Sequence, residues 1–278
     1  MSNHEFHVIA AYKFVRLEVL PVLQADLLAG LQEAGVLGTV LLADEGINLT
    51  LAGNATSIDQ ARRRITAFPS FSDLWFKESR STIPPFGKLK VKIRHEIIAF
   101  DNGQVRPDQT PAPNLSPATL KRWLDEGREF TLLDTRNRYE VESGTFTRAE
   151  SLPIDTFRDF PAAINHAELD RTKPVVTFCT GGVRCEKAAP WLLDAGFTEV
   201  YQVEGGIFNY FDTCGGSHWR GDCFVFDDRV EIDIALTETG AKLCTNCHRA
   251  VSLAQQESEL FVAGVSCPAC AGHQGVHQ

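Results

Sequence analysis

Cys179 is the side chain in this sequence best placed to act as a nucleophile. It ends an apolar stretch over residues 174–178, and a loop of small residues follows it: Thr180, Gly181, Gly182 and Val183. Arg184 and a segment of helical character over residues 182–195 come next. Glycines let successive backbone amides face one point, and a helix N-terminus adds partial positive charge there. Such surroundings lower a thiol pKa and favour a thiolate, or an anionic adduct on its sulfur.

The spacing within this loop narrows the chemistry. A protein phosphatase loop has its arginine six positions after the cysteine, whereas Arg184 is five positions after Cys179 and position 185 is itself a cysteine. Cys185 has two interpretations. It resolves a disulfide or a sulfenic acid formed on Cys179, or it packs as a small residue in the first helical turn.

Four further cysteines form two Cys-x-x-Cys pairs near the C-terminus: Cys244, Cys247, Cys267 and Cys270. The 19 residues between the pairs suit a tetrahedral zinc site in which each tight turn supplies two sulfurs. A four-cysteine site leaves no open position for substrate, so we expect a structural zinc ion. His248 and His273 are alternative ligands that we expect to be exposed. Cys214 and Cys223 either approach the Cys179 loop or simply pack.

A strand is expected over residues 88–100, and charged and apolar residues alternate strictly in its first part, residues 88–94. One face of that strand carries four cations: Lys88, Lys90, Lys92 and Arg94. Residues 60–95 have a net charge of +7 in a chain whose net charge is −9. Positive charge concentrated in this way fits contact with an RNA backbone. The alternative is a solvated edge strand whose lysines deter aggregation.

The elements that must position these groups fall into two domains and a tail. Residues 1–102 predict the order strand, helix, strand, strand, helix, strand, which is typical of a ferredoxin-like α+β domain. The expected segments are 7–12, 21–35, 36–43, 47–52, 56–67 and 74–78, with Thr56 as the cap of the second helix.

The second domain follows a proline-rich interval. Prolines at positions 107, 111 and 113 predict that residues 103–116 are a semi-rigid linker without sheet or helix. Residues 117–213 alternate apolar strands with helices, which predicts a parallel α/β sheet, and Pro190 is expected to kink the helix after Cys179. Residues 214–278 form a small Cys-rich region.

Composition excludes several classes of protein. Of the 278 residues, 44% are hydrophobic and 23% charged, which are globular values. We find no apolar run near the roughly 18 residues that a membrane span needs and no signal-peptide pattern, so we expect a cytoplasmic protein without membrane contact. The eight cysteines all lie at or after position 179, which argues against a disulfide framework.

The second domain resembles the rhodanese family. Cys179 to Arg184 resembles the six-residue rhodanese loop, with Cys179 at the position that forms a persulfide. Asp134-Thr135-Arg136 resembles the family's Asp-x-Arg, Glu140 stands at its acidic position, and Gly205-Gly206 resembles its late glycine turn. Residues 144–149 read Gly-Thr-Phe-Thr-Arg-Ala where many rhodaneses have Gly-His-Ile-x-Gly-Ala.

Three segments give the whole chain a more specific resemblance, to the tRNA uridine(34) hydroxylase family. They are residues 42–50 (LADEGINLT), 179–188 (CTGGVRCEKA) and 219–230 (WRGDCFVFDDRV). The resemblance implies an acylphosphatase-like N-terminal domain, a rhodanese domain and a Cys-rich tail. It also implies conversion of the tRNA wobble uridine to 5-hydroxyuridine, with molecular oxygen as co-substrate and the anticodon arm as partner.

We assign residue roles within this resemblance, while the Cys179 loop and the zinc tail leave two rival functions open. Cys179 would attack C6 of the uracil, or carry a sulfur or peroxide species. Arg184 and the loop amides would stabilise the anion that develops. The remaining candidate catalytic residues are Asp134, Arg136 and Cys185. The sequence carries no haem, flavin or nicotinamide motif and identifies no electron donor. The alternatives are a sulfurtransferase that carries a Cys179 persulfide and a non-catalytic adaptor built on the zinc tail.

Overall fold

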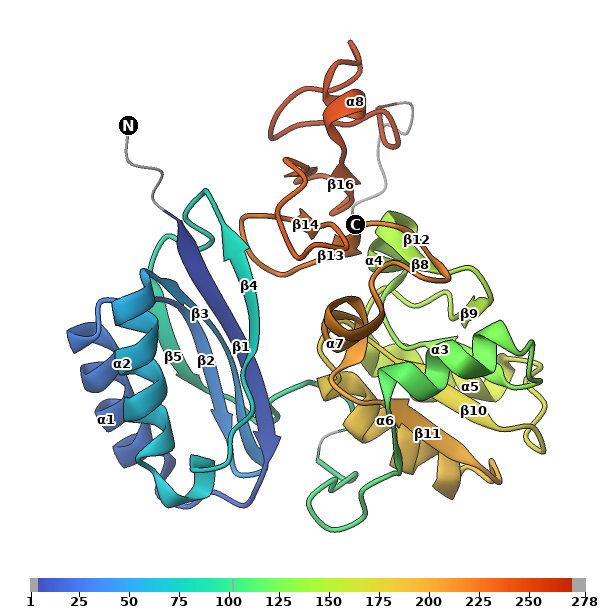
Figure 1. The fold of residues 1–278 in the computed structure, drawn as a ribbon, viewed down its shortest axis with the longest axis horizontal. Helices are drawn as coiled ribbons and strands as arrows, with labels where there is room; N and C mark the ends of the chain where they lie inside the picture. The colour runs from blue at the N-terminus through green and yellow to red at the C-terminus, as the bar shows by residue number, and fades with distance from the viewer. Residues whose placement is uncertain (1–4, 102, 272–278) are drawn as a thin grey trace.

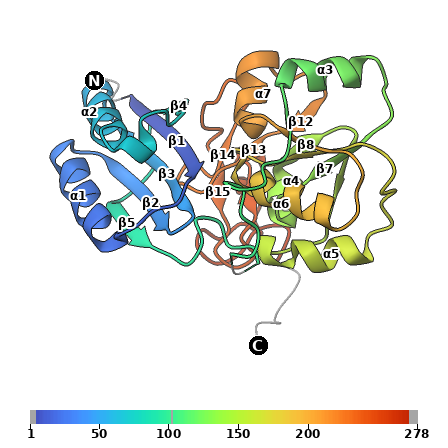
Figure 2. The same ribbon diagram turned by 90° about the horizontal axis from the view of Figure 1, so that it is seen from below.

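The computed structural model describes residues 5–101 and 103–271. Two α/β domains lie side by side, and the C-terminal segment lies at one end of the pair (Figures 1 and 2). No helix in the described part of the chain is long and apolar enough to cross a membrane.

The N-terminal domain has the expected ferredoxin-like order. Its elements are β1 (Phe6–Phe14), α1 (Leu20–Glu33), β2 (Leu37–Ala43), β3 (Gly46–Gly53), α2 (Ala55–Thr66), the 3-10 turn η1 (Pro69–Phe71), β4 (Lys77–Ser81) and β5 (Leu89–Ile93). The sheet order is β4-β1-β3-β2-β5, antiparallel except for the parallel pair β2 and β5. Both long helices pack on one face, where the core includes Leu27, Leu31, Ile58 and Ile65. The opposite face is free of helices and turns toward the second domain (Figure 2).

Three sequence predictions in this domain were wrong in detail. Asn54 caps α2, because its side chain accepts a hydrogen bond from the Ser57 amide at 2.9 Å, and Thr56 lies inside the helix. The fourth strand begins at Lys77 rather than residue 74, because Leu74 is buried in the helix-covered core. β5 ends at Ile93 rather than residue 100, since the chain then leaves the sheet and places Phe100 in the core of the second domain.

The interval expected to lack sheet contains a two-residue strand, β6 (Asn114–Leu115). It pairs in parallel with β11 (Val200–Val203) at one edge of the second sheet. The Gln202 backbone amide donates to the Pro113 carbonyl at 3.0 Å. Pro113 thus pairs with the sheet edge through its carbonyl oxygen, and its missing N–H is not required there. Ala112 and Leu115 are buried, and the interval is therefore packed against the second domain along part of its length.

The second domain is a parallel sheet with helices on both faces. Its elements are β6, α3 (Pro117–Asp125), β7 (Thr131–Asp134), α4 (Arg138–Ser143), β8 (Gly144–Phe146), β9 (Ala149–Ser151), the 3-10 turn η2 (Phe157–Asp159), α5 (Phe160–His166), β10 (Val175–Phe178), α6 (Val183–Asp194), β11 and α7 (Gly206–Cys214). The strand order is β6-β11-β10-β7-β9. Helices α3 and α7 contribute to the core on one face, and α5 and α6 to the core on the other. Pro190 lies inside α6, as expected.

This topology places the candidate catalytic residues at the carboxyl ends of the parallel strands. β7 ends at Asp134 and the adjacent parallel strand β10 ends at Phe178, with these two residues in register. The Asp-x-Arg segment and the Cys179 loop therefore leave the sheet side by side, at the carboxyl ends where α/β folds bind ligands.

Buried charges and the tail hold the two domains together. Lys187 of α6 is fully buried, with Nζ 2.9 Å from Glu45 Oε2 and 2.6 Å from Glu96 Oε1, and both carboxylates belong to the N-terminal part of the chain. Arg229 of the tail is bidentate to Asp227 and donates to Ser79 Oγ of β4 at 2.8 Å.

Short strand pairs anchor the tail itself. β12 (Trp219–Gly221) pairs with β8, and β13 (Cys223–Phe224) pairs with β14 (Glu231–Ile232). The last elements are β15 (Lys242–Leu243), β16 (Ala250–Val251) and α8 (Leu253–Gln256).

Candidate active site

The Cys179 sulfur lies within a turn of backbone amides, as the sequence predicted. Gly182 has φ +100°, and its amide donates to Cys179 Sγ at 3.1 Å. Burial opposes ionisation of this thiol, but the Cys185 thiol, the Arg184 charge and the Arg184 and Gly182 amides outweigh it. The pKa of Cys179 is thereby lowered to about 5, so at neutral pH the side chain is a thiolate.

Cys185 is buried directly behind this sulfur. Burial, together with the neighbouring Cys179 charge, raises the pKa of Cys185 well above the ordinary thiol value, so its proton stays in place. Its sulfur also lies 3.7 Å from Thr135 Oγ1. Cys185 is thus a neutral hydrogen-bond donor to the Cys179 thiolate.

The buried charged residues around the Cys179 loop pair with one another. Arg184 is bidentate to Glu140, at 2.6 and 2.7 Å, and acts on Cys179 through its charge. Arg136 is bidentate to Asp134 and donates to the Gly144 carbonyl at 2.6 Å.

Position separates these candidates into two groups. Arg184 and the loop residues Thr180, Gly181 and Val183 line a cavity with Cys179, whereas Asp134, Arg136 and Cys185 lie behind the loop and do not line it. The structure therefore brings all the candidate catalytic residues together, but only the first group can touch a bound molecule.

The Gly205-Gly206 turn holds the Cys179 loop in place through close backbone contacts. Gly206 has φ +66°, and a Cβ there would overlap the carbonyl oxygen of Cys179. The amides of Ile207 and Phe208 donate to the carbonyls of Cys179 and Thr180, at 2.9 and 3.2 Å. Only glycine allows the backbones to approach this closely.

The Cys179 loop opens into a cavity of about 670 Å³ between the two domains, a volume typical of small-ligand sites. The helix-free face of the first sheet supplies one wall, including Tyr12, Thr39 and Leu41. The tail supplies Phe226, whose side chain is 65% exposed and whose ring lies 5.9 Å from the Arg184 guanidinium carbon. An exposed aromatic ring beside an activated thiolate suits a flat, unsaturated substrate.

The basic strand runs toward this cavity. Lys90 and Lys92 pair in register with Thr39 and Leu41, which line the cavity, while the alternate residue Val91 packs in the helix-covered core. Lys88 is exposed, and Arg94 lines the cavity itself. The positive charge of residues 60–95 is divided between two faces, however, because Arg62, Arg63 and Arg64 lie on α2.

Three residues from the N-terminal domain were not foreseen. Tyr12 donates to Glu186 Oε1 at 3.0 Å, and the Lys77 ammonium lies 4.7 Å from the Tyr12 ring centre and 4.6 Å from that of Trp75. Lys77 alternates with Ser79 and Ser81 on the inner face of β4. Because all five residues of β4 are polar, the sequence carries no signal for its inner face, and only the tertiary structure reveals that Lys77 shares a cavity with Cys179.

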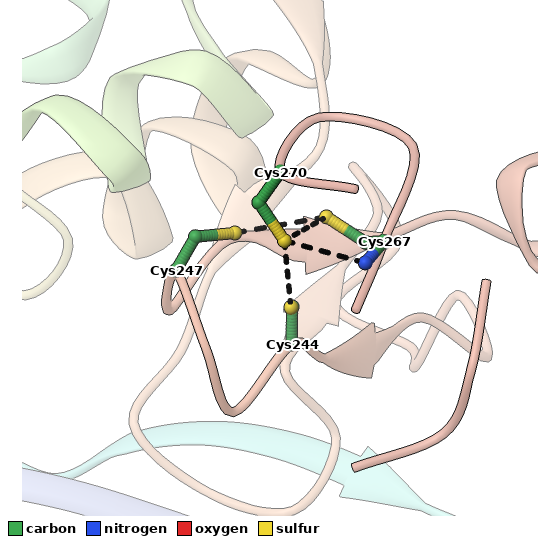
Figure 3. A group of neighbouring side chains, drawn as sticks. All are labelled: Cys244, Cys247, Cys267 and Cys270. Atoms are coloured by element: carbon green, nitrogen blue, oxygen red, sulfur yellow. Dashed lines mark hydrogen bonds between the residues drawn. The ribbon is translucent and has the colours of Figure 1, made fainter. Parts of the chain in front are cut away.

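The four tail cysteines converge as expected (Figure 3). Their sulfurs all lie within 4.8 Å of one another, and three of the separations are 3.6, 3.7 and 3.8 Å. Four sulfurs placed about 2.3 Å from a tetrahedral zinc ion would be roughly 3.8 Å apart. Three of the separations match this value, and the cluster therefore could hold a metal ion. His248 is exposed as expected, and His273 lies outside the described residues.

Neither remaining cysteine joins the cavity lining. Cys223 is fully buried, and burial raises its pKa to about 12. Cys214 is half-buried against the core at the end of α7. Cys214 is therefore a packing residue, whereas Cys223 both packs in the core and approaches the Cys179 loop at Thr180.

Two family models match the chain. Residues 6–97 match the UPF0176 acylphosphatase like domain, and residues 116–213 match the rhodanese-like domain. These matches agree with the ferredoxin-like and parallel α/β topologies described above.

Curated relatives are similar over nearly the whole chain. A tRNA uridine(34) hydroxylase of Cupriavidus taiwanensis is 46% identical over 95% of this chain and 96% of its own length. A tRNA uridine(34) hydroxylase of Bordetella petrii is 49% identical over 84% of this chain and 95% of its own length. Among solved structures, a rhodanese-like domain from Anabaena sp. is 25% identical, with a TM-score of 0.33 over 39% of this chain and 79% of its own.

Proposed function

Because the chain belongs to the tRNA uridine(34) hydroxylase family, we propose that it converts the wobble uridine of tRNA to 5-hydroxyuridine with Cys179 as its nucleophile. The observation that carries the proposal is the Cys179 thiolate at a cavity walled by both domains. Because the proposed substrate is tRNA, we propose that the protein acts in the cytoplasm.

The anticodon loop suits such a site because its bases are already unpaired. A single-stranded base can be splayed from its neighbours at low cost and bound between aromatic side chains. Phe226 offers an exposed ring at the cavity, and the Cys179 thiolate lines the same cavity. In this proposal the target uracil enters the cavity while the rest of the anticodon arm stays on the surface.

Cations on both domains would hold the phosphates beside the flipped nucleotide. Arg94 and Arg158 are exposed and line the cavity from opposite domains, and Lys88, Lys90 and Lys92 extend the positive surface along β5. Replacing Lys90 and Lys92 by alanine should weaken tRNA binding. The slope of the logarithm of the binding constant against the logarithm of the salt concentration should become shallower by about one unit for each phosphate contact that is lost. Arg63→Ala is the matched control, because it removes an exposed charge from the opposite face of the same domain.

The deciding experiment measures 5-hydroxyuridine at tRNA position 34 by mass spectrometry in a strain that lacks the gene. Complementation with the wild-type chain should restore the modified nucleoside, and Cys179→Ser should not. Cys214→Ser is the matched control, because that cysteine lies outside the cavity. Unmodified uridine in the strain with the wild-type chain would refute the proposal.

Oxygen is proposed as the co-substrate, with one of its atoms entering the product. Growth under ¹⁸O-labelled oxygen should then add two mass units to the nucleoside. The second oxygen atom would leave as water, with two electrons from an external donor. A hydroxyl that carries no label would assign its oxygen to water instead.

A second function is favoured by the same loop. Amides and Arg184 around Cys179 would stabilise a persulfide as well as a thiolate, which is the requirement for sulfur transfer. Rapid thiosulfate-to-cyanide transfer that Cys179→Ser abolishes, with no change in tRNA hydroxylation on deletion, would favour this function.

We also propose that the ion held by the cysteine cluster is a structural zinc. Protein purified without added metal should then contain about one zinc per chain, and Cys267→Ser should lose it. Because the cluster lies apart from the Cys179 cavity, the zinc would stabilise the tail and take no part in the reaction. A zinc content near zero in protein with reduced thiols would reject this site.

A further inference from the structure

Lys77 is a buried cation for which the fold alone gives no reason. Its side chain comes from β4 of the N-terminal domain, is only 7% exposed and lines the cavity that contains Cys179. Within residues 5–101 and 103–271, no carboxylate lies at ion-pair distance from its ammonium. Burying a charge without a partner is costly, so such a group normally serves a ligand or a reaction.

The aromatic rings beside Lys77 hold its ammonium in place, but no residue that the structure describes accepts a hydrogen bond from it. Tyr12 and Trp75 lie on either side at 4.7 and 4.6 Å from ring centre to Nζ, which gives cation–π stabilisation. The Tyr12 hydroxyl donates its hydrogen to Glu186. Burial lowers the pKa of Lys77 to about 8, while the nearby Cys179 and Glu186 charges oppose that change. At neutral pH the side chain is therefore mostly charged, with three donors available.

The other cations of the cavity are either paired or at its surface. Arg184 is bound to Glu140, and Arg229 is bound to Asp227. Arg94 and Arg158 are exposed, so they suit phosphates outside the cavity rather than a base within it. Lys77 alone combines burial with free donors among these five cations.

We propose that Lys77 is a catalytic residue that binds O4 of the target uracil and stabilises the enolate formed when Cys179 adds to C6. The inference rests on the proposed function and assigns the group that recognises the base. It also gives the N-terminal domain a part in the chemistry, in addition to RNA binding.

The addition step balances without any oxidant. The Cys179 thiolate forms a sulfur–C6 bond, the C5–C6 π pair moves to the C4–C5 bond, and the C4–O4 π pair becomes the negative charge on O4. The Lys77 ammonium donates a hydrogen bond to that oxygen. The enolate can take a proton from water at C5, lose the original C5 proton and expel the thiolate, which regenerates uracil with an exchanged hydrogen.

The same contact discriminates between pyrimidines. Uracil presents a carbonyl at position 4, whereas cytosine presents an amino group, which is a donor. An ammonium has no acceptor, so a cytosine amino group at this position would leave both groups unpaired. Lys77 therefore favours uridine over cytidine.

Exchange at C5 tests the proposal apart from oxidation. The assay uses the full-length protein under nitrogen with tRNA that carries tritium at C5 of uridine 34, and it measures tritium released to water. Lys77→Met keeps the length of the side chain but removes its charge, and should slow release at least 100-fold, as expected for the loss of an oxyanion donor. Lys77→Arg should retain release within about tenfold of wild type. Lys121→Met on the surface of α3 is the control and should leave release unchanged.

Two further measurements separate catalysis from folding. Lys77→Met should melt within a few degrees of wild type, and iodoacetamide should still alkylate its Cys179 at pH 9 within threefold of the wild-type rate. An equal loss of alkylation and tritium release would overturn the proposal, because Lys77 would then act on the thiolate rather than the base. Release by Lys77→Met above one third of the wild-type rate would also overturn it, while leaving the proposed function intact.

The wild-type protein distinguishes the remaining outcomes. Hydroxylation in air without tritium release under nitrogen would exclude addition to C6, and the role of Lys77 with it. Neither hydroxylation nor release would refute the proposed function itself, and Lys77 would then have no uracil to bind.

Discussion

Replacing Cys185 by alanine should raise the pKa of the Cys179 thiolate. Cys185 is buried and protonated, and its thiol hydrogen-bonds to the Cys179 sulfur. Alanine fills part of the same space but offers no donor. The thiolate would then lose one of the groups that favour it, while the Gly182 amide and the Arg184 charge would remain.

The size of the effect follows from the energy of that hydrogen bond. A hydrogen bond to a charged acceptor contributes about 1.5–3 kcal/mol, and about 1.4 kcal/mol corresponds to one pH unit. The pKa should therefore move from about 5 to roughly 6–7. At pH 6 the thiolate fraction would fall from about 90% to between about 10% and 50%.

Alkylation of Cys179 by iodoacetamide, followed across pH by mass spectrometry of its peptide, measures this change. The wild-type midpoint should lie near pH 5, and that of Cys185→Ala one to two units higher. Cys185→Ser is the matched control, because its hydroxyl keeps a donor and should keep the midpoint low. An unchanged midpoint in Cys185→Ala would refute the hydrogen-bond role and leave Cys185 as a packing residue. A wild-type midpoint near 8.5 would refute the thiolate itself.

Three other perturbations test the buried groups around the site. Lys187→Met should destabilise the protein by about 3–5 kcal/mol in urea unfolding, since it leaves Glu45 and Glu96 buried without their cation. Gly206→Ala should slow Cys179 alkylation and tRNA hydroxylation at least tenfold, because the added Cβ would displace the Cys179 carbonyl. Ionised Cys179 should also stabilise the fold: its folded pKa of about 5 lies below the roughly 8.5 of an unfolded thiol. This contribution is complete above about pH 8.5 and is lost as the pH falls toward 5, so Cys179→Ser should flatten the pH dependence of stability over that range.

Matched variants limit the explanations of these results. Lys173→Met removes a half-exposed lysine and should lower the free energy of unfolding by less than 1 kcal/mol. An equal loss of stability in Lys173→Met and Lys187→Met would contradict the buried-charge argument. Gly127 also has positive φ, but open space surrounds it. Gly127→Ala should therefore carry the same backbone strain but keep the reactivity of Cys179. A similar loss of reactivity in Gly127→Ala would show that the close contact at Gly206 is not its cause.

Several local features could be predicted because neighbouring residues determine them. The Cys179 loop forms from a strand end, two glycines and a helix start, all within a few residues. The alternation of Lys90, Val91 and Lys92 determined which side of β5 faces the core. The two Cys-x-x-Cys pairs each form a tight turn, so their convergence needed only one long-range contact.

Errors occurred where distant contacts outweigh local preference. The segment after Ile93 was predicted to continue the strand, yet it leaves the sheet, and Glu96 there binds the buried Lys187 of the second domain. The proline-rich interval contributes a short strand because the edge of β11 offers a free row of hydrogen bonds. Neither partner can be identified from the neighbouring residues.

The sequence alone therefore identified the cysteine that we propose as nucleophile, its amide-rich loop, the basic strand and the four cysteines that could hold a metal ion, since each depends on residue type and short spacing. Only the tertiary structure decided that the open face of the first sheet closes over that loop, which brings Lys77 and Tyr12 to Cys179. The physical reason is that this cavity depends on buried charge pairs between residues more than 90 positions apart, such as Glu96 and Lys187. No local propensity encodes contacts of that range.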